Sequence, residues 1–305
     1  MINILPSFLV IEDLNKRYGN KQALKNVSLT IGKNQIVALV GENGAGKSTL
    51  LSAIVGLVQA DSGSINFLDQ RITGSGSPEI CFAGQDLPLP SALTVKQLIR
   101  ITELMNSNFD SKYALTRLNK LGIPLNGKYG RLSGGTKAEV ALTLALSRYS
   151  SLVILDEPLA NLDPVAKIQA TRDILMRKLE TNASFIISTH SINELQAICD
   201  SIVLLSNGEI SLLGSVDDLL ESHVVYLCDP RELEGLPQES IVLRSLESGF
   251  SSNLARKIPG VPPLKIESRQ ASLDEIIISY LQRNLEIGRL SRIGTSEGKF
   301  AHDKI

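Results

Sequence analysis

A glycine-rich segment between two apolar runs constrains the fold of this chain more than any other feature. Residues 41–49 read Gly-Glu-Asn-Gly-Ala-Gly-Lys-Ser-Thr, follow the apolar run 36–40 and lead into the largely apolar run 50–54. The segment therefore lies where a buried strand turns into a helix. Glycines let the backbone curl without side-chain clashes, and the N–H groups of a helix N-terminus carry partial positive charge. This pattern predicts a phosphate-binding loop in an α/β fold with a parallel sheet.

The side chains of this loop indicate which groups a nucleotide would meet. Lys47 is placed to reach the β- and γ-phosphates, and the hydroxyl of Ser48 is placed to ligate Mg²⁺. The alternative, a glycine-rich turn without a ligand, is disfavoured by the strand before it and the helix after it. We expect nucleotide contacts from the whole loop, which consists of Gly41, Glu42, Asn43, Gly44, Ala45, Gly46, Lys47, Ser48 and Thr49.

Length, charge and cysteine usage narrow the function classes. With 305 residues and a net charge of −1, the chain can bury a full core and has no overall field that would attract nucleic acid. Cys81, Cys199 and Cys228 match no metal spacing, so we expect buried thiols in a reducing compartment. No apolar run approaches about 18 residues, and residues 1–6 lack the features of a signal peptide. If the function involves a membrane, a partner would have to supply the membrane span.

Two adjacent carboxylates end a second apolar strand. The run 152–155 is followed by Asp156 and Glu157. Acids at the tip of a buried strand are costly unless a cation or a water molecule uses them. We expect Asp156 to hold the Mg²⁺ shell and Glu157 to polarise an attacking water molecule, with a solvated strand end as the alternative.

His190 follows a further apolar strand. Ser191 and Glu194 have the spacing of a capping box, which would begin a helix and hold His190 on the ligand side of the sheet. An imidazole in this place can donate a hydrogen bond to a γ-phosphate or to the attacking water. A loop histidine without a partner is the alternative, and we keep that interpretation for His223 and His302.

Two further helix starts carry polar caps. Ser133 precedes Gly134, Gly135 and a helical pattern, so it is expected to be an N-cap beside exposed backbone N–H groups. This is a second potential phosphate site, on a different element from Lys47. Asp163, which a proline follows, is expected to be the N-cap of another helix.

Tyr18 and Gln85 are the remaining candidates. Tyr18 lies in a turn-rich patch, residues 15–20, and is either an exposed loop tyrosine or a ring that stacks on a nucleobase. Gln85 follows the strand expected at 80–83. A parallel sheet presents its ligands at the carboxyl ends of its strands, which favours a role for Gln85.

The remaining patterns divide the chain into parts. Residues 1–220 are expected to form a nucleotide-binding domain with an N-terminal antiparallel β subdomain and a helical insert at about 91–150. Residues 221–285 are expected to form a small α+β appendage. Residues 286–305 are polar and expected to be poorly ordered.

Within the appendage, three short apolar runs predict strands, at residues 224–227, 241–243 and 264–266. Ser272 and Glu275 have the spacing of a capping box and predict a helix that follows them.

Taken in order, the motifs of residues 8–220 resemble those of the ATP-binding subunit of an ABC transporter. The matching segments are the Walker A loop at 41–49, the Q-loop at Gln85, the signature at 132–135, Walker B at 152–157, the D-loop at 159–163, the switch histidine at His190 and the adenine-stacking aromatic at Tyr18. Thr136 departs from the family, which usually has Gln or a similar long side chain at this position. The D-loop also opens differently, with Leu-Ala-Asn at 159–161.

The resemblance implies how ATP is held. Two subunits, either two copies of this chain or this chain and a homologous ATPase subunit, would pair head to tail. ATP would lie between Lys47 of one chain and Ser133-Gly134-Gly135 of the other. This fits the observation that the N–H groups behind Ser133 lie on a different element from Lys47.

The resemblance also implies a metal site and partners. Ser48, Gln85 and Asp156 would hold Mg²⁺, and Asp163 would lie at the nucleotide site between the two subunits. ATP hydrolysis would drive a separate integral membrane permease from the inner, cytoplasmic face of the cell membrane. The appendage looks like the tail of ATPases that pair with ABC-2-type exporters, which favours export.

Two other functions stay open. A soluble ABC ATPase that acts on DNA or ribosomes would need a coiled-coil or zinc-binding insert or a second nucleotide domain, and the sequence indicates none of these. A regulatory module that binds nucleotide without hydrolysing it is disfavoured by Glu157 and His190, although Thr136 leaves it open.

Overall fold

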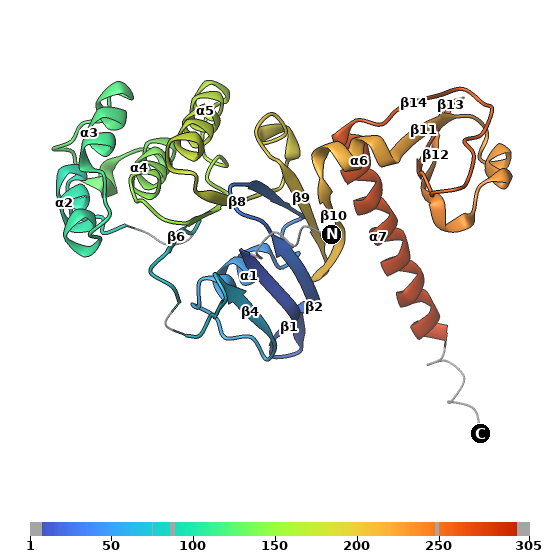
Figure 1. Ribbon diagram of the computed structural model, residues 1–305, viewed down its shortest axis with the longest axis horizontal. Coiled ribbons are helices and arrows are strands. Elements are labelled where there is room, and N and C mark those ends of the chain that lie inside the picture. The colour runs from blue at the N-terminus through green and yellow to red at the C-terminus, as the bar shows by residue number, and fades with distance from the viewer. Residues whose placement is uncertain (1–7, 75, 86–88, 248–249, 298–305) are drawn as a thin grey trace, which may run out of the picture. The chain divides into compact units, whose positions relative to one another are not determined.

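The computed structural model describes residues 8–74, 76–85, 89–247 and 250–297 (Figure 1). It divides into two compact units, Met1–Ile210 and Ser211–Ile305, and strand β10 (Glu209–Ser215) runs across the division. The sequence pattern predicted this boundary after residue 220. The expectations for residues 1–6 and for the last eight residues of the tail lie outside the described residues. We describe each unit by itself.

Six strands form the central sheet of the first unit, in the order β10-β9-β3-β8-β7-β6. β3 pairs in parallel with β8 and β9, and β7 pairs in parallel with β6 and β8, so the predicted parallel sheet is confirmed. The carboxyl ends of these strands therefore lie at one edge of the sheet. The strands besides β10 are Ile36–Val40 (β3), Ile80–Ala83 (β6), Leu152–Asp156 (β7), Ser184–Thr189 (β8) and Ser201–Ser206 (β9).

One face of this sheet packs against helix α1 (Lys47–Ile54) and an antiparallel sheet of order β2-β1-β4-β5. Alternate residues of the central strands, such as Val37 and Leu39, join Leu50 of α1 in this core. Strands buried on both faces read as continuous apolar runs, which explains 36–40 and 152–155. The antiparallel strands are Leu9–Tyr18 (β1), Lys21–Ile31 (β2), Ser62–Phe67 (β4) and Gln70–Arg71 (β5).

The turn expected at residues 15–20 is shorter than predicted. β1 continues to Tyr18, and only Gly19 and Asn20 form the turn to β2. Irregular register along the β1–β2 pair accommodates the polar residues of β1 without ending the strand.

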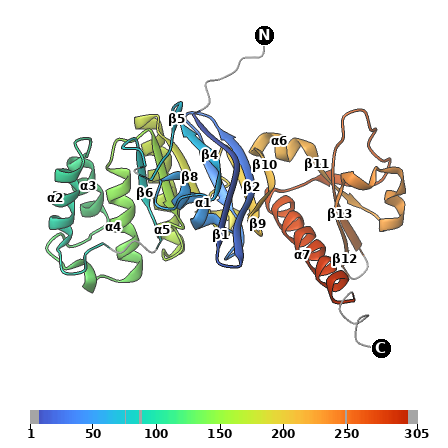
Figure 2. The ribbon, with the colours of Figure 1, turned by 90° about the horizontal axis from the view of Figure 1, so that it is seen from below.

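The predicted helical insert is present at one end of the first unit (Figure 2). It consists of α2 (Val95–Met105), α3 (Ser111–Lys120), the 3-10 turn η1 (Tyr129–Arg131) and α4 (Gly134–Leu146). α4 packs against α3 and against β6 and β7. Helix α5 (Pro164–Thr181) follows β7, and the Asp163 side chain accepts hydrogen bonds from two N–H groups of its first turn, as predicted.

The second unit contains an antiparallel sheet of order β12-β13-β11-β14, together with helices α6 and α7. Its elements are α6 (Val216–Ser222), β11 (His223–Leu227), two 3-10 turns, η3 (Pro230–Gly235) and η4 (Gln238–Ser240), β12 (Ile241–Glu247), β13 (Phe250–Arg256), β14 (Ser268–Gln270) and α7 (Leu273–Glu297).

Three expectations for the second unit need correction. The apolar run 264–266 is not a strand, although Leu264 and Ile266 pack against a small core, and the paired strand is β14. Strand β13 was missed because its residues are largely polar. The helix that Ser272 caps, with Glu275 as reciprocal partner, continues to Glu297, so residues 286–297 are helical.

His223 has partners, contrary to the interpretation as a free loop histidine. It is 1% exposed, and its Nδ1 lies 2.8 Å from the carbonyl oxygen of Leu219. Its Nε2 lies 3.2 Å from the hydroxyl of Tyr280 on α7. Burial lowers the pKa of His223, the hydrogen bond to Leu219 opposes this, and the nearby positive charges of Arg256 and Lys257 lower the pKa further.

We expect the second unit to lose stability in mild acid through His223. Because its pKa is lowered on folding, the unfolded chain binds the proton more readily. The contribution is complete above the unfolded pKa of about 6.5 and declines as the pH falls below it, by at most about 1.4 kcal/mol per pH unit for one proton. Urea unfolding of the wild type and of His223→Gln between pH 7.5 and 5 checks this. Equal pH slopes for the two proteins would contradict it.

Burial of the cysteines is as expected for two of the three. Burial raises the pKa of Cys81 and Cys199 to about 11, whereas Cys228 is only partly buried. Within the described ranges, no helix is both long and apolar enough to cross a bilayer. The same ranges contain no group of three or more His, Cys, Asp or Glu side chains that could hold a metal.

Candidate functional site

The loop at 41–49 is packed so closely that two of its positions require glycine. A Cβ on Gly41 would lie 2.4 Å from the carbonyl oxygen of Leu205, and one on Gly46 would lie 2.5 Å from that of Ala23. Gly46 also has a φ of 110° at the start of α1. The backbone of the loop is thus held between β2 and the end of β9, with the N-terminus of α1 directed at it. Such a cradle fits a phosphate group.

Lys47 is the cation of the site. Its Nζ lies 2.8 Å from the carbonyl oxygen of Gly41, 3.3 Å from that of Glu42 and 3.4 Å from Oε1 of Glu157. The Lys47 side chain is 5% exposed and that of Glu157 is 12% exposed. These three acceptors match the three donors of an ammonium group. The structure therefore brings together two predicted site residues from distant parts of the chain.

His190 approaches the same carboxylate. Its Nδ1 lies 3.7 Å from Oε2 of Glu157, and its side chain is 53% exposed. Lys47 is therefore next to one carboxylate oxygen of Glu157, and His190 is next to the other.

The segment after His190 differs from the predicted capped helix. Ile192–Glu194 forms one 3-10 turn (η2), and among the described contacts of Ser191 there is no side-chain cap bond. Thr189 makes the side-chain hydrogen bonds of this segment instead. Its Oγ1 accepts the N–H of Ser191 and donates to Oε2 of Glu194 at 3.0 Å. Glu194 also pairs with Lys167 of α5 at 2.6 Å. This network ties the segment that carries His190 to α5.

Ser188 is a site residue that the sequence analysis missed. Its Oγ donates to Oδ1 of Asp156 at 2.5 Å and accepts the N–H of Glu157 at 2.8 Å. Glu157 has a φ of 49°, a region that residues other than glycine adopt rarely and at some cost. Ser188 therefore holds both carboxylate residues in place. The sequence showed only a hydroxyl residue near the end of an apolar strand, and the structure supplies its register with Asp156.

A cavity of about 490 Å³ adjoins the carboxylates. Its lining includes Gln85, Gly134, Asp156, Glu157 and Asn161. The start of α4 and the Q-loop therefore face the carboxyl end of β7 within one chain.

The end of the β1–β2 hairpin lies near the phosphate loop. Tyr18, which is 49% exposed, pairs with Lys21 across the turn. The Lys21 Nζ lies 3.7 Å from the position that a Cβ on Gly44 would occupy. Lys21 is a second cation near the loop that the sequence analysis did not single out, and only the hairpin geometry reveals it.

Ser133 and Gly134 are exposed at the start of α4, and the Ser133 side chain caps that helix as predicted. A Cβ on Gly135 would lie 3.0 Å from the carbonyl oxygen of Asn161, so the signature segment packs against the loop that precedes Asp163.

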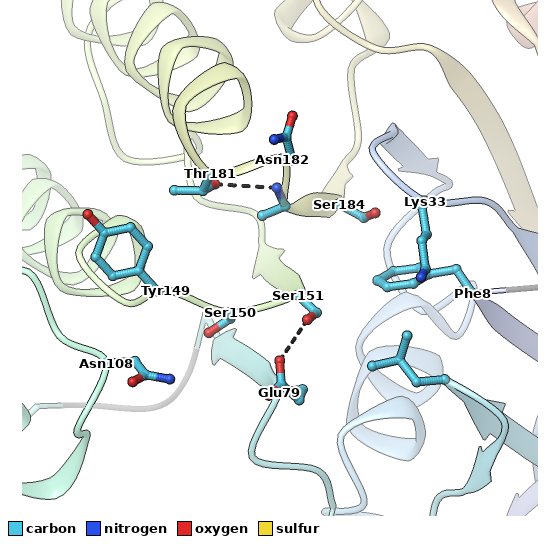
Figure 3. A pocket seen from close by; sticks show the side chains of 12 residues that line it. Phe8, Lys33, Glu79, Asn108, Tyr149, Ser150, Ser151, Thr181, Asn182 and Ser184 are labelled. Carbon is cyan, nitrogen blue, oxygen red and sulfur yellow. Dashed lines mark hydrogen bonds between the residues drawn. The ribbon is translucent and has the colours of Figure 1, made fainter.

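A second cavity, of about 350 Å³, lies at the opposite edge of the sheet (Figure 3). Its lining includes residues just before the strands, such as Lys33 before β3 and Glu79 before β6. Figure 3 shows the Ser151 hydroxyl directed at Glu79, to which it donates at 2.6 Å. Ligands of open α/β sheets bind at the carboxyl ends of the strands. We therefore assign the site to the edge that carries Lys47 and Glu157.

A phosphate loop between a parallel strand and a helix, with carboxylates at the end of another strand of that sheet, defines the class of P-loop nucleoside triphosphatases. Residues 24–160 match the family model described as ABC transporter. The chain belongs to the ATP-binding subunits of ABC transporters and is an ATPase of that family.

Individual relatives agree with this. The ABC transporter ATP-binding protein YtrB of Bacillus subtilis is 31% identical over 216 residues, which cover 70% of this chain and 74% of that protein. The phosphonates import ATP-binding protein PhnC of Fusobacterium nucleatum is 32% identical, with coverage of 68% and 92%. A solved structure of an ATP binding subunit of an ABC transporter has a TM-score of 0.64 at 26% identity and covers 70% of this chain and 92% of that one.

Proposed function

We propose that residues 41–49 hold the phosphates of ATP and that Glu157 polarises the attacking water. The observation that carries this is the 3.4 Å contact between Lys47 Nζ and Glu157 Oε1 beside the glycine cradle. The Lys47 ammonium exchanges its present acceptors for the β- and γ-phosphates. His190, on the other oxygen of Glu157, donates to the γ-phosphate or to the water.

We propose that Mg²⁺ binds beside Ser48, Gln85 and Asp156. Ser48 and Gln85 are exposed, and Asp156 ends β7, where its Oδ1 accepts a hydrogen bond from Ser188. These are oxygen ligands of the kind that Mg²⁺ prefers. A bound Mg²⁺ would neutralise charge on the β- and γ-phosphates. Tyr18 stacks on the adenine, which its exposure and its place beside Lys21 support.

We propose that ATP also binds a second subunit, a copy of this chain or a homologue. The partner's signature supplies Ser133, Gly134 and Gly135, and Asp163 lies at the same interface. The exposure of Ser133 and Gly134 supports this, because a capped helix start on the surface offers its N–H groups to an external anion. A phosphate that bridges two helix N-termini stabilises the closed pair, and hydrolysis removes the bridge.

We propose that ATP hydrolysis by this subunit drives an integral membrane permease. The subunit binds that permease at the cytoplasmic face of the membrane, and we expect no nucleic acid among its partners. The export hypothesis rests on the second unit alone. The phosphonates protein among the relatives is named as an import protein, and it matches only 68% of this chain. The likeness of the ATP-binding unit therefore favours neither direction.

Replacement of Lys47 tests the nucleotide site. We expect Lys47→Ala to weaken binding of Mg·ATP by at least about tenfold, because charge-assisted hydrogen bonds to the phosphates are lost. Titration with a fluorescent ATP analogue measures this. Lys33→Ala removes the same charge at the opposite edge of the sheet and is the matched control. Unchanged affinity in Lys47→Ala would refute the proposed site.

Copurification tests the partner. We expect the tagged chain to retain an integral membrane protein from detergent-solubilised membranes. Recovery of ribosomes or DNA without such a protein would favour the alternative of a soluble ABC ATPase.

A further inference from the structure

The N-cap of α4 contains a hydrogen bond between two side chains. The Ser133 Oγ accepts the N–H of Thr136 at 3.2 Å and lies 2.8 Å from the Thr136 Oγ1. Ser133 is exposed, whereas Thr136 is half-buried behind it. Thr136 is also the position at which this chain departs from the signature of its family.

The bonding capacity of the two hydroxyls decides which of them donates when an anion is present. A serine hydroxyl has one donor and two acceptor lone pairs. The N–H of Thr136 occupies one lone pair of Ser133. A phosphate oxygen accepts only, so Ser133 must direct its O–H at the phosphate. The second lone pair of Ser133 is then left for the Thr136 O–H, and each bond in this series polarises the next.

The backbone at the start of α4 has little room to move toward the phosphate in place of the Ser133 hydroxyl. Gly135 packs so closely on Asn161 that a Cβ on it would lie 3.0 Å from the Asn161 carbonyl oxygen. The start of α4 is thereby held against the loop before α5. Rotation of the Ser133 hydroxyl is the adjustable element, and Thr136 is the side chain in contact with it.

We propose that Thr136 is a positioning residue that turns the Ser133 hydroxyl outward, as a donor to the terminal phosphate of ATP held by a second subunit. Thr136 itself does not touch the phosphate. The inference rests on the proposed function, in which the signature of one chain completes the ATP site of another.

The test measures ATP-driven dimerisation in a Glu157→Gln background, by the ATP concentration that gives half-maximal dimer in sedimentation velocity. Thr136→Val keeps the branched shape and removes the hydroxyl, and we expect it to raise that concentration about three- to tenfold. Thr136→Ser restores the hydroxyl and should restore the parent value. Thr116→Val, an exposed site on α3, is the matched control.

A double-mutant cycle separates positioning from a merely structural effect. Ser133→Ala should weaken dimerisation at least as much as Thr136→Val, and adding Thr136→Val to Ser133→Ala should have no further effect. If Thr136→Val does not fold, as judged by its melting temperature, Thr136→Ala takes its place in the cycle.

The outcomes distinguish the two proposals. Parent-like dimerisation of Thr136→Val, or an equal penalty with and without Ser133, would overturn the role of Thr136 and leave the proposed function intact. Absence of any ATP-driven dimer in the Glu157→Gln parent would overturn the proposed function and this inference with it.

Discussion

Glu157→Gln is expected to lower the rate of ATP hydrolysis by at least about 100-fold while ATP still binds. The amide keeps the size of the side chain but cannot polarise a water molecule as a carboxylate does. Lys47 and the glycine cradle, which hold the phosphates, are unchanged. The ATP-bound pair of subunits should therefore accumulate, because the step that removes the γ-phosphate is blocked.

Phosphate release and light scattering in the presence of Mg·ATP measure the two parts of this result. Glu79→Gln, at the opposite edge of the sheet, is the matched control and should hydrolyse ATP at the wild-type rate. Undiminished hydrolysis by Glu157→Gln would remove Glu157 from the role of base. Loss of hydrolysis without an ATP-bound dimer would contradict the shared site instead.

Arg117→Ala is expected to destabilise the first unit by about 3–5 kcal/mol. Arg117 on α3 is 5% exposed and pairs with Glu139 of α4 at 2.8 Å and with Asp173 of α5 at 2.8 Å. Its guanidinium also donates to Thr143. Removal of the cation leaves the carboxylate of Glu139, which is 7% exposed, without its ion-pair partner and takes one donor from Asp173.

Urea unfolding followed by circular dichroism measures the loss, and hydrogen exchange of the α3 and α4 amides shows where it occurs. Arg100→Ala removes a surface pair with Glu103 and should cost less than about 1 kcal/mol. The double variant Arg117→Met/Glu139→Leu should recover much of the stability, because apolar replacement of a buried pair is often neutral. A cost below about 1 kcal/mol for Arg117→Ala would show that the network is not needed.

Local patterns were sufficient for most elements of the first unit. Continuous apolar runs predicted β3 and β7, and the caps at Ser133 and Asp163 predicted where α4 and α5 begin. These features depend on neighbours along the chain, which a sequence displays directly. The second unit was predicted less well, since β13 has few apolar residues and its pairing with β11 joins segments that are separated in the chain.

The sequence by itself determined the phosphate loop, the strand-end carboxylates and the order of the motifs, because each is a short pattern whose chemistry follows from residue type and spacing. Only the tertiary structure decided that Lys47, Glu157 and His190 meet, that Ser188 joins Asp156 to Glu157, and that Lys21 lies over Gly44. The place of Lys21 depends on how the antiparallel β1–β2 hairpin packs beside the loop. The other contacts depend on the order of the strands in the parallel sheet. That order is set by packing between segments far apart in the chain, and no local pattern encodes it.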